Sequence, residues 1–196
     1  MTGQFMNIKK LAYQWIVDDA DKTDVKSSYY CQTRDIFQAR LNSMRLTLLN
    51  NKIRSEENIY IITAVAGEIG NNSFDHNLGN WPDIMGIFFG YETNNQRLEI
   101  VLADRGQGVL KTLKNAKPEL KTDIEALKTA FTEKISGRAP ENRGNGLKFV
   151  KNNIKIIKAN LNFVSGNAEA KLNNEMTIKQ IDQNIQGCLV EIKIKK

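Results

Sequence analysis

Apolar residues recur every three or four positions through most of the first 78 residues, as on the buried face of a helix. The pattern predicts helices at about 8–16, 36–48 and 57–78, with a polar connection at 18–28. The apolar stripe of the third helix is Ile59, Ile62, Ala66 and Ile69. At about 100° per residue, Glu68, Asn72 and Asp75 share a different face of that helix.

The second half of the chain contains strand-like segments and shorter helices. Two strands are expected at 84–92 and 97–103, joined by a turn at Asn94 and the residue after it. Helices are expected at 109–115, 123–134 and 147–158, and closing strands at 160–164, 168–172, 176–181 and 188–194. This order predicts an α+β fold, a two-layer α/β sandwich with helices packed on one face of a mixed, mainly antiparallel sheet.

Length and composition place the chain among ordinary globular domains. It has 196 residues, of which 41% are hydrophobic and 26% charged, enough for one domain with a substantial core. No apolar run approaches the roughly 18–20 residues that a membrane span needs. We therefore expect a cytoplasmic protein without a membrane segment, in which Cys31 and Cys188 are reduced.

The net charge of +6 is concentrated locally. Between Glu141 and Glu169 the sequence has no acidic residue, whereas Lys148, Lys151, Lys155 and Lys158 recur there at helical spacing. A solvated helix face explains this pattern, and so does a docking stripe for an acidic partner. Both interpretations stay open at this point.

Glu68 and Asn72 form the first candidate site. They are four residues apart, so they are neighbours on the polar face of the predicted helix. An asparagine oxygen is a hard, neutral ligand that suits Mg²⁺, and a carboxylate one turn earlier can orient or deprotonate a water or a hydroxyl. Taken alone, the segment is more simply explained as the polar face of a surface helix.

The second candidate segment is Asp104-Arg105-Gly106-Gln107-Gly108, which follows an apolar strand. A carboxylate at the end of a buried strand can accept a hydrogen bond from the amine of adenine. Gly106 and Gly108 would let the backbone turn and pass close to the base. An ordinary strand-to-helix turn is the alternative interpretation.

The third segment, Gly144-Asn145-Gly146, precedes the helix that begins at Leu147. A helix N-terminus offers free backbone N–H groups and the positive end of its dipole to phosphate, and Arg143 adds charge. The alternative is a glycine-rich loop without a ligand.

In this order the three segments resemble the gyrase, heat-shock ATPase, histidine kinase and mismatch-repair (GHKL, Bergerat-fold) ATP-binding family. The resemblance implies that Asn72 binds Mg²⁺, Glu68 is the general base and Asp104 recognises adenine. The nucleotide-binding residues that it implies are Asn72, His76, Asp104, Gly106, Gly108, Arg143, Gly144, Gly146 and Leu147. The implied ATP-binding domain is at 56–196, with a lid at about 111–142. Residues 1–55, which the resemblance does not cover, are expected to form a helical N-terminal extension.

The compact second glycine box is closest to that of stand-alone anti-sigma-factor kinases. The only histidine, His76, lies inside the first segment, so an autophosphorylating histidine kinase is not expected. We expect a module that binds ATP or ADP with Mg²⁺ and acts on a regulatory protein partner as a nucleotide-gated switch or slow ATPase. A serine/threonine kinase of the anti-sigma-factor type is the alternative, and a basic nucleic-acid binder is less favoured. The N-terminal helices also offer a surface for a homodimer, and the lid is expected to become ordered over ATP.

Overall fold

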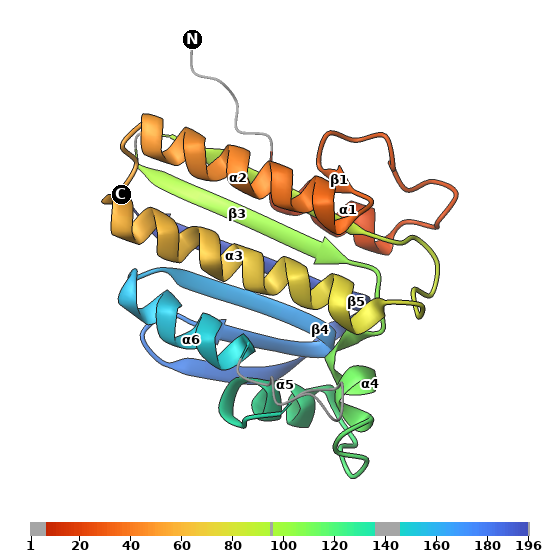
Figure 1. The fold of residues 1–196 in the computed structure, drawn as a ribbon. Helices are drawn as coiled ribbons and strands as arrows, with labels where there is room; N and C mark the ends of the chain where they lie inside the picture. The colour runs from red at the N-terminus through yellow and green to blue at the C-terminus, as the bar shows by residue number, and fades with distance from the viewer. Residues whose placement is uncertain (1–6, 95, 136–145, 196) are drawn as a thin grey trace.

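The computed structural model describes residues 7–94, 96–135 and 146–195, and its centre is a five-stranded sheet (Figure 1). The strand order is β1-β2-β3-β5-β4, and every neighbouring pair in it is antiparallel. The strands are β1 (Tyr30–Cys31), β2 (Ile87–Thr93), β3 (Arg97–Asp104), β4 (Asn160–Leu172) and β5 (Met176–Lys195). The central strand is therefore β3, which pairs with β2 and β5.

A layer of helices covers one face of this sheet (Figure 1). The helices of the described residues are α1 (Ile8–Val17), α2 (Arg34–Asn50), α3 (Glu56–Asn77), α4 (Gly108–Lys114), α5 (Asp123–Thr132) and α6 (Gly146–Ile156). Buried side chains of α2, α3, α5 and α6 form one cluster with Ile100 and Leu102 of β3 and with Val190 of β5. The predicted two-layer sandwich is confirmed. Within the described ranges, no helix has both the length and the apolarity to cross a bilayer.

Helix α1 lies on the opposite face of the sheet. Successive side chains of a strand point to opposite faces, so Ile100 and Leu102 face the helical layer while Val101 and Ala103 point away from it. Val101 and Ala103 pack in a second buried cluster with Ile8, Ala12, Trp15 and Ile16 of α1. This helix adds a short cover to the two-layer core.

The observed elements follow the predicted ones closely, with two differences. Tyr30 and Cys31, for which no element was predicted, form the edge strand β1 beside β2. The four predicted closing strands are two long ones. The gap expected between 164 and 168 is a register shift at Gly166, where φ is +58°, so β4 bends there without ending.

The helix that carries Glu68 and Asn72 is held in place by α2. Phe37 and Leu41 of α2 are buried and pack in the main core with α3. Gly70 of α3 makes the closest approach, because a Cβ added there would lie 2.3 Å from the ring of Phe37. A Cβ added at Gly67 would instead meet only the end of the Leu41 side chain, at 3.2 Å.

We expect Gly70→Ala to destabilise the fold by about 1–3 kcal/mol, because the buried ring of Phe37 must move. Gly67→Ala is the matched control on the same helix. Replacing glycine by alanine in a helix gains about 1 kcal/mol of helix propensity. This gain should offset the mild contact of the new Cβ with Leu41, so that stability is unchanged or slightly higher. Urea unfolding of the two variants measures the difference. Equal stability would show that α2 and α3 are not in close contact at Gly70.

Candidate functional site

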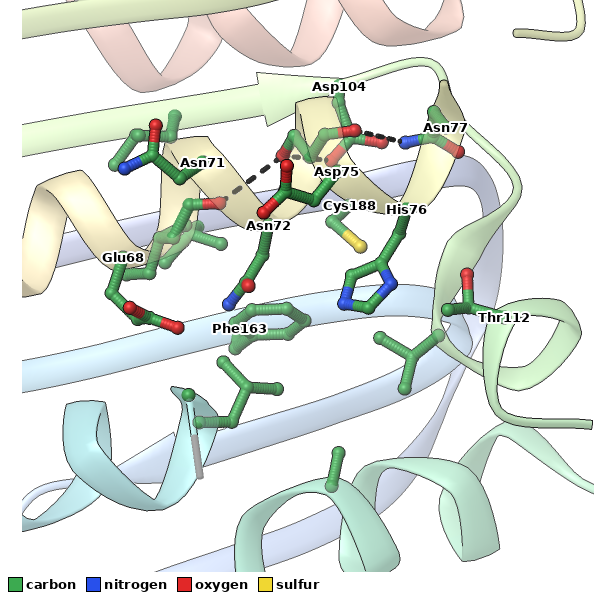
Figure 2. A pocket seen from close by; sticks show the side chains of 18 of the residues that line it. Glu68, Asn71, Asn72, Asp75, His76, Asn77, Asp104, Thr112, Phe163 and Cys188 are labelled. Atoms are coloured by element: carbon green, nitrogen blue, oxygen red, sulfur yellow. Dashed lines mark hydrogen bonds between the residues drawn. The ribbon is translucent and has the colours of Figure 1, made fainter. Parts of the chain in front are cut away.

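A cavity of about 640 Å³ lies between α3, the end of β3, the part of β5 around Cys188, α4 and the first turn of α6 (Figure 2). Seven of the residues singled out from the sequence line it: Glu68, Asn72, His76, Asp104, Gly108, Gly146 and Leu147. Arg143 and Gly144 lie outside the described residues, so their placement stays a prediction. Segments far apart in the sequence thus meet at one cavity.

Helix α3 supplies the polar wall of the cavity. Its N-terminus is capped by Ser55, whose side chain accepts a hydrogen bond from the N–H of Asn58, and its apolar stripe is buried against the sheet. Glu68, Asn72 and His76 follow one another at intervals of four residues, and Figure 2 shows their side chains projecting into the cavity. All three are partly exposed. They are therefore accessible to a ligand.

Asp104 ends β3 and is only 3% exposed. Its Oδ2 accepts a hydrogen bond from Ser73 Oγ at 2.7 Å (Figure 2). Its Oδ1 accepts one from the N–H of Gly106 at 2.9 Å. Burial raises the pKa of the carboxyl above its ordinary value, and these hydrogen bonds only partly oppose that shift. The cavity thus contains a desolvated carboxyl held in a fixed orientation.

The turn after Asp104 is packed too closely for larger residues. A Cβ at Gly106 would lie within 2.3 Å of the Asn77 side chain, and Gly108 has a φ of +75°. Asn77 Oδ1 accepts a hydrogen bond from the N–H of Gln107 at 2.8 Å, and Ser165 Oγ accepts one from the N–H of Val109 at 3.0 Å. Gly106 thus allows the turn to pack against Asn77 without itself lining the cavity, whereas Gly108 lines the cavity.

The first turn of α6 approaches α3 just as closely. A Cβ at Gly146 would lie 2.3 Å from Glu68 Oε1 and 2.9 Å from Asn72 Nδ2. Two of the three sequence segments therefore meet at Glu68, and a larger residue at position 146 would require the Glu68 and Asn72 side chains to move.

The remaining lining is mainly apolar. It includes Val109, Leu113, Leu147, Phe163 and Val190. At the rim, Arg34 of α2 forms an ion pair with Asp75 of α3. Cys188, a free thiol like Cys31, also faces the cavity (Figure 2). No cluster of three or more His, Cys, Asp or Glu side chains suited to a metal occurs in the described ranges.

Several residues of the site were not assigned a role from the sequence. Ser73, Asn77, Ser165 and Arg34 orient the carboxyl, support the glycine turn or line the rim. The only local signal was the polar run after Asn72. The contribution of Ser165 depends on a contact 56 residues away in sequence, which no local pattern reveals.

The region predicted as a lid, at about 111–142, is described as far as residue 135. Within it, Thr122 and Glu125 form a capping box at the start of α5, and Leu127 and Phe131 are buried in the main core. Helix α5, within the region predicted as a lid, is therefore packed into the core of the domain. Residues 136–142 lie outside the described residues, and closure over a ligand stays a prediction.

Neither the protein-family models nor the curated proteins compared with the chain gave a match. Among solved structures, the chain is similar to the histidine kinase domain from the Erythrobacter litoralis EL346 blue-light activated histidine kinase, with 16% identity and a TM-score of 0.38. That similarity covers 97% of this chain and 75% of the other. At this TM-score the function has to be inferred from the cavity itself.

The raised pKa of Asp104 predicts a stability effect that is independent of any ligand. In the folded state the Asp104 carboxyl keeps its proton to a higher pH than in the unfolded chain, where the pKa of an aspartate is about 3.9. Ionisation of Asp104 therefore reduces wild-type stability as pH rises from about 4 through the folded pKa. Asp104→Asn removes the titrating group, while its oxygen still accepts from Gly106.

We expect the free energy of unfolding of Asp104→Asn, relative to wild type, to rise with pH over that interval. Urea unfolding of both proteins between pH 4 and 8 measures it. A difference that stays constant with pH would mean that Asp104 is not held in a desolvated site.

Proposed function

We propose that the cavity binds ATP together with Mg²⁺, as the resemblance to the GHKL family implies. The observation that carries the proposal is the position of Asp104, a buried and oriented carboxyl in a cavity with apolar walls. The polar side chains of α3 and the start of α6 border the same cavity. Its volume of about 640 Å³ is typical of small-molecule sites.

The chemistry of Asp104 suits adenine. Ser73 and the backbone of Gly106 and Cys188 donate hydrogen bonds to this carboxyl group. Two carboxylate oxygens offer about four lone-pair positions, so acceptor capacity remains for a ligand. An exocyclic amine is a donor that can use it. Val109, Leu113 and Phe163 offer apolar surface for the base. The residues present therefore fit a planar heterocycle with an amine.

Asn72, His76 and the first turn of α6 suit the phosphates. Asn72 has an amide oxygen that is a suitable Mg²⁺ ligand, and Gly146 places the N-terminal end of α6 next to it. Bound Mg²⁺ would supply charge neutralisation of the phosphates. Because residue 146 is a glycine, it places no side chain between the N-terminal end of α6 and the cavity.

Glu68 is the candidate base. It is partly exposed in the cavity and lies one helical turn before Asn72. A carboxylate there can accept a proton from a water, which gives hydrolysis, or from a protein hydroxyl, which gives a serine/threonine kinase. We favour a slow ATPase or a nucleotide-gated switch acting on a protein partner.

The regulatory part of the proposal is supported by α6. This helix begins at Gly146 in the cavity and carries Lys148, Lys151 and Lys155 at partly or fully exposed positions. A partner with acidic groups that contacts these lysines would touch the helix that also borders the ligand. The partner itself and a homodimer through the N-terminal helices stay predictions.

Asp104→Asn should reduce ATP affinity by about 1–3 kcal/mol, which is about 5- to 150-fold, because the amide can present a donor to the adenine amine. Isothermal titration with ATP and ADP, with and without Mg²⁺, measures this loss. Asp182→Asn, at an exposed position of β5 outside the cavity, is the matched control and should bind like wild type. Absence of heat and of a thermal shift in the wild type would refute nucleotide binding.

Glu68→Ala and Asn72→Ala should separate chemistry from binding. We expect Glu68→Ala to retain ATP but to lose at least about 100-fold in phosphate release or transfer, because a general base is removed. Asn72→Ala should instead weaken binding of ATP in the presence of Mg²⁺. The two residues are one turn apart on α3, so each variant controls for the other's effect on the helix.

Incubation with [γ-³²P]ATP, with and without cell lysate, measures both outcomes. Release of phosphate without a labelled protein supports the ATPase, and one labelled partner supports the kinase. Equal turnover by wild type and Glu68→Ala would remove Glu68 from the chemistry.

A further inference from the structure

Arg105 directly follows Asp104 in sequence, but its side chain is buried on the other side of the sheet. It is 6% exposed. Successive side chains at the end of a strand point in opposite directions, so Asp104 faces α3 and the cavity while Arg105 reaches α1. One peptide unit thus connects the cavity with the N-terminal helix.

The guanidinium of Arg105 binds the C-terminal end of α1. Its Nη1 donates to the carbonyl oxygens of Trp15 at 2.9 Å, Ile16 at 3.0 Å and Asp18 at 2.8 Å. The last carbonyls of a helix have no partner within the helix, and its C-terminal end attracts positive charge. The last turn of α1 has no basic residue of its own. Arg105 supplies that charge from a distant part of the sequence.

The other side of the guanidinium is held by Asp83, in the loop between α3 and β2. Nε donates to Asp83 Oδ2 at 3.0 Å, and Nη2 donates to the same oxygen at 2.6 Å. Burial alone would raise the pKa of Asp83, but its hydrogen bonds with Arg105 and Ile84 and the charge of Arg105 keep that pKa below its usual value. Arg105 is therefore fixed between two separate segments.

The backbone around Arg105 is hydrogen-bonded to Asp104, which lines the cavity. The Arg105 carbonyl accepts a hydrogen bond from Gln186 Nε2 at 3.1 Å, and the next N–H, of Gly106, donates to Asp104 Oδ1. A displacement of the Arg105 side chain would therefore be transmitted to the carboxyl and to the glycine turn.

We propose that Arg105 is a positioning residue that couples the docking of α1 on the back of the sheet to ligand occupancy of the cavity at Asp104. This inference rests on the proposed ATP site for the identity of the ligand. Coupling between two sites is reciprocal: if docked α1 favours the ligand-binding arrangement, bound ligand stabilises docked α1. A merely structural cap would stabilise α1 without responding to ligand.

Hydrogen–deuterium exchange of the full chain, with and without saturating ATP and Mg²⁺, tests this coupling. In the wild type we expect ATP to slow amide exchange in residues 104–113 and also, by about fivefold or more, in α1 on the opposite face. Arg105→Lys keeps the charge, but a single ammonium cannot bind both Asp83 and the three carbonyls of α1. In this variant α1 should exchange faster and should no longer respond to ATP.

Lys9→Gln is the matched control. It removes a different charged contact of α1, from Lys9 Nζ to Glu191 at 3.1 Å, without touching the glycine turn. It should leave the response of α1 to ATP in place. The wild-type comparison requires no variant, so failure of Arg105→Lys to fold does not prevent the test.

The outcomes separate the two proposals. Protection of residues 104–113 by ATP with unchanged exchange in α1 overturns the coupling and leaves the nucleotide site standing. Absence of protection in both regions refutes the nucleotide site. If ATP protects neither region, the coupling is tested by comparing Arg105→Lys with wild type in the absence of ligand. Faster exchange of both α1 and residues 106–113 in the variant supports the coupling. Faster exchange of α1 alone overturns it.

Discussion

The arrangement of this domain depends on keeping one carboxyl out of water at the end of its central strand. Desolvation of Asp104 is unfavourable to its charged form, as the raised pKa shows. Ser73 from α3 and the N–H of Gly106 supply the hydrogen bonds that partly offset this cost. The bond from Ser73 also joins α3 to the end of β3. The cavity therefore exists where the helical layer and the sheet are tied together by polar contacts.

The close glycine contacts follow from the same constraint. At Gly106 the turn passes against Asn77, and at Gly146 helix α6 passes against Glu68. In both places the neighbouring side chain belongs to α3. One helix thus determines which backbone segments can approach the cavity, and it is itself seated on α2 through Gly70 and Phe37. The segment before residue 56 is in this sense part of the support of the site.

Much of this arrangement could be predicted from the sequence. The stripe from Ile59 to Ile69 correctly placed Glu68 and Asn72 on the free face of α3, because helical periodicity is a local property. The apolar run before Asp104 likewise predicted a strand at 97–103, and the observed strand ends one residue later, at Asp104. The position of α1 behind the sheet, the edge strand at Tyr30 and the contacts of Arg105 could not be predicted. They depend on partners about 55–90 residues away, and no local pattern encodes such pairings.

The strand order also has a consequence for biosynthesis. β5 follows every other described strand in sequence, yet it lies between β3 and β4, with Cys188 opposite Asp104. Until a ribosome has made β5, one edge of β3 lacks its hydrogen-bonding partner, and the backbone beside Asp104 is incomplete. The nascent chain would thus acquire its cavity in one late step. Before that step, the open edge of β3 is the part of the chain most exposed to pairing with a wrong strand.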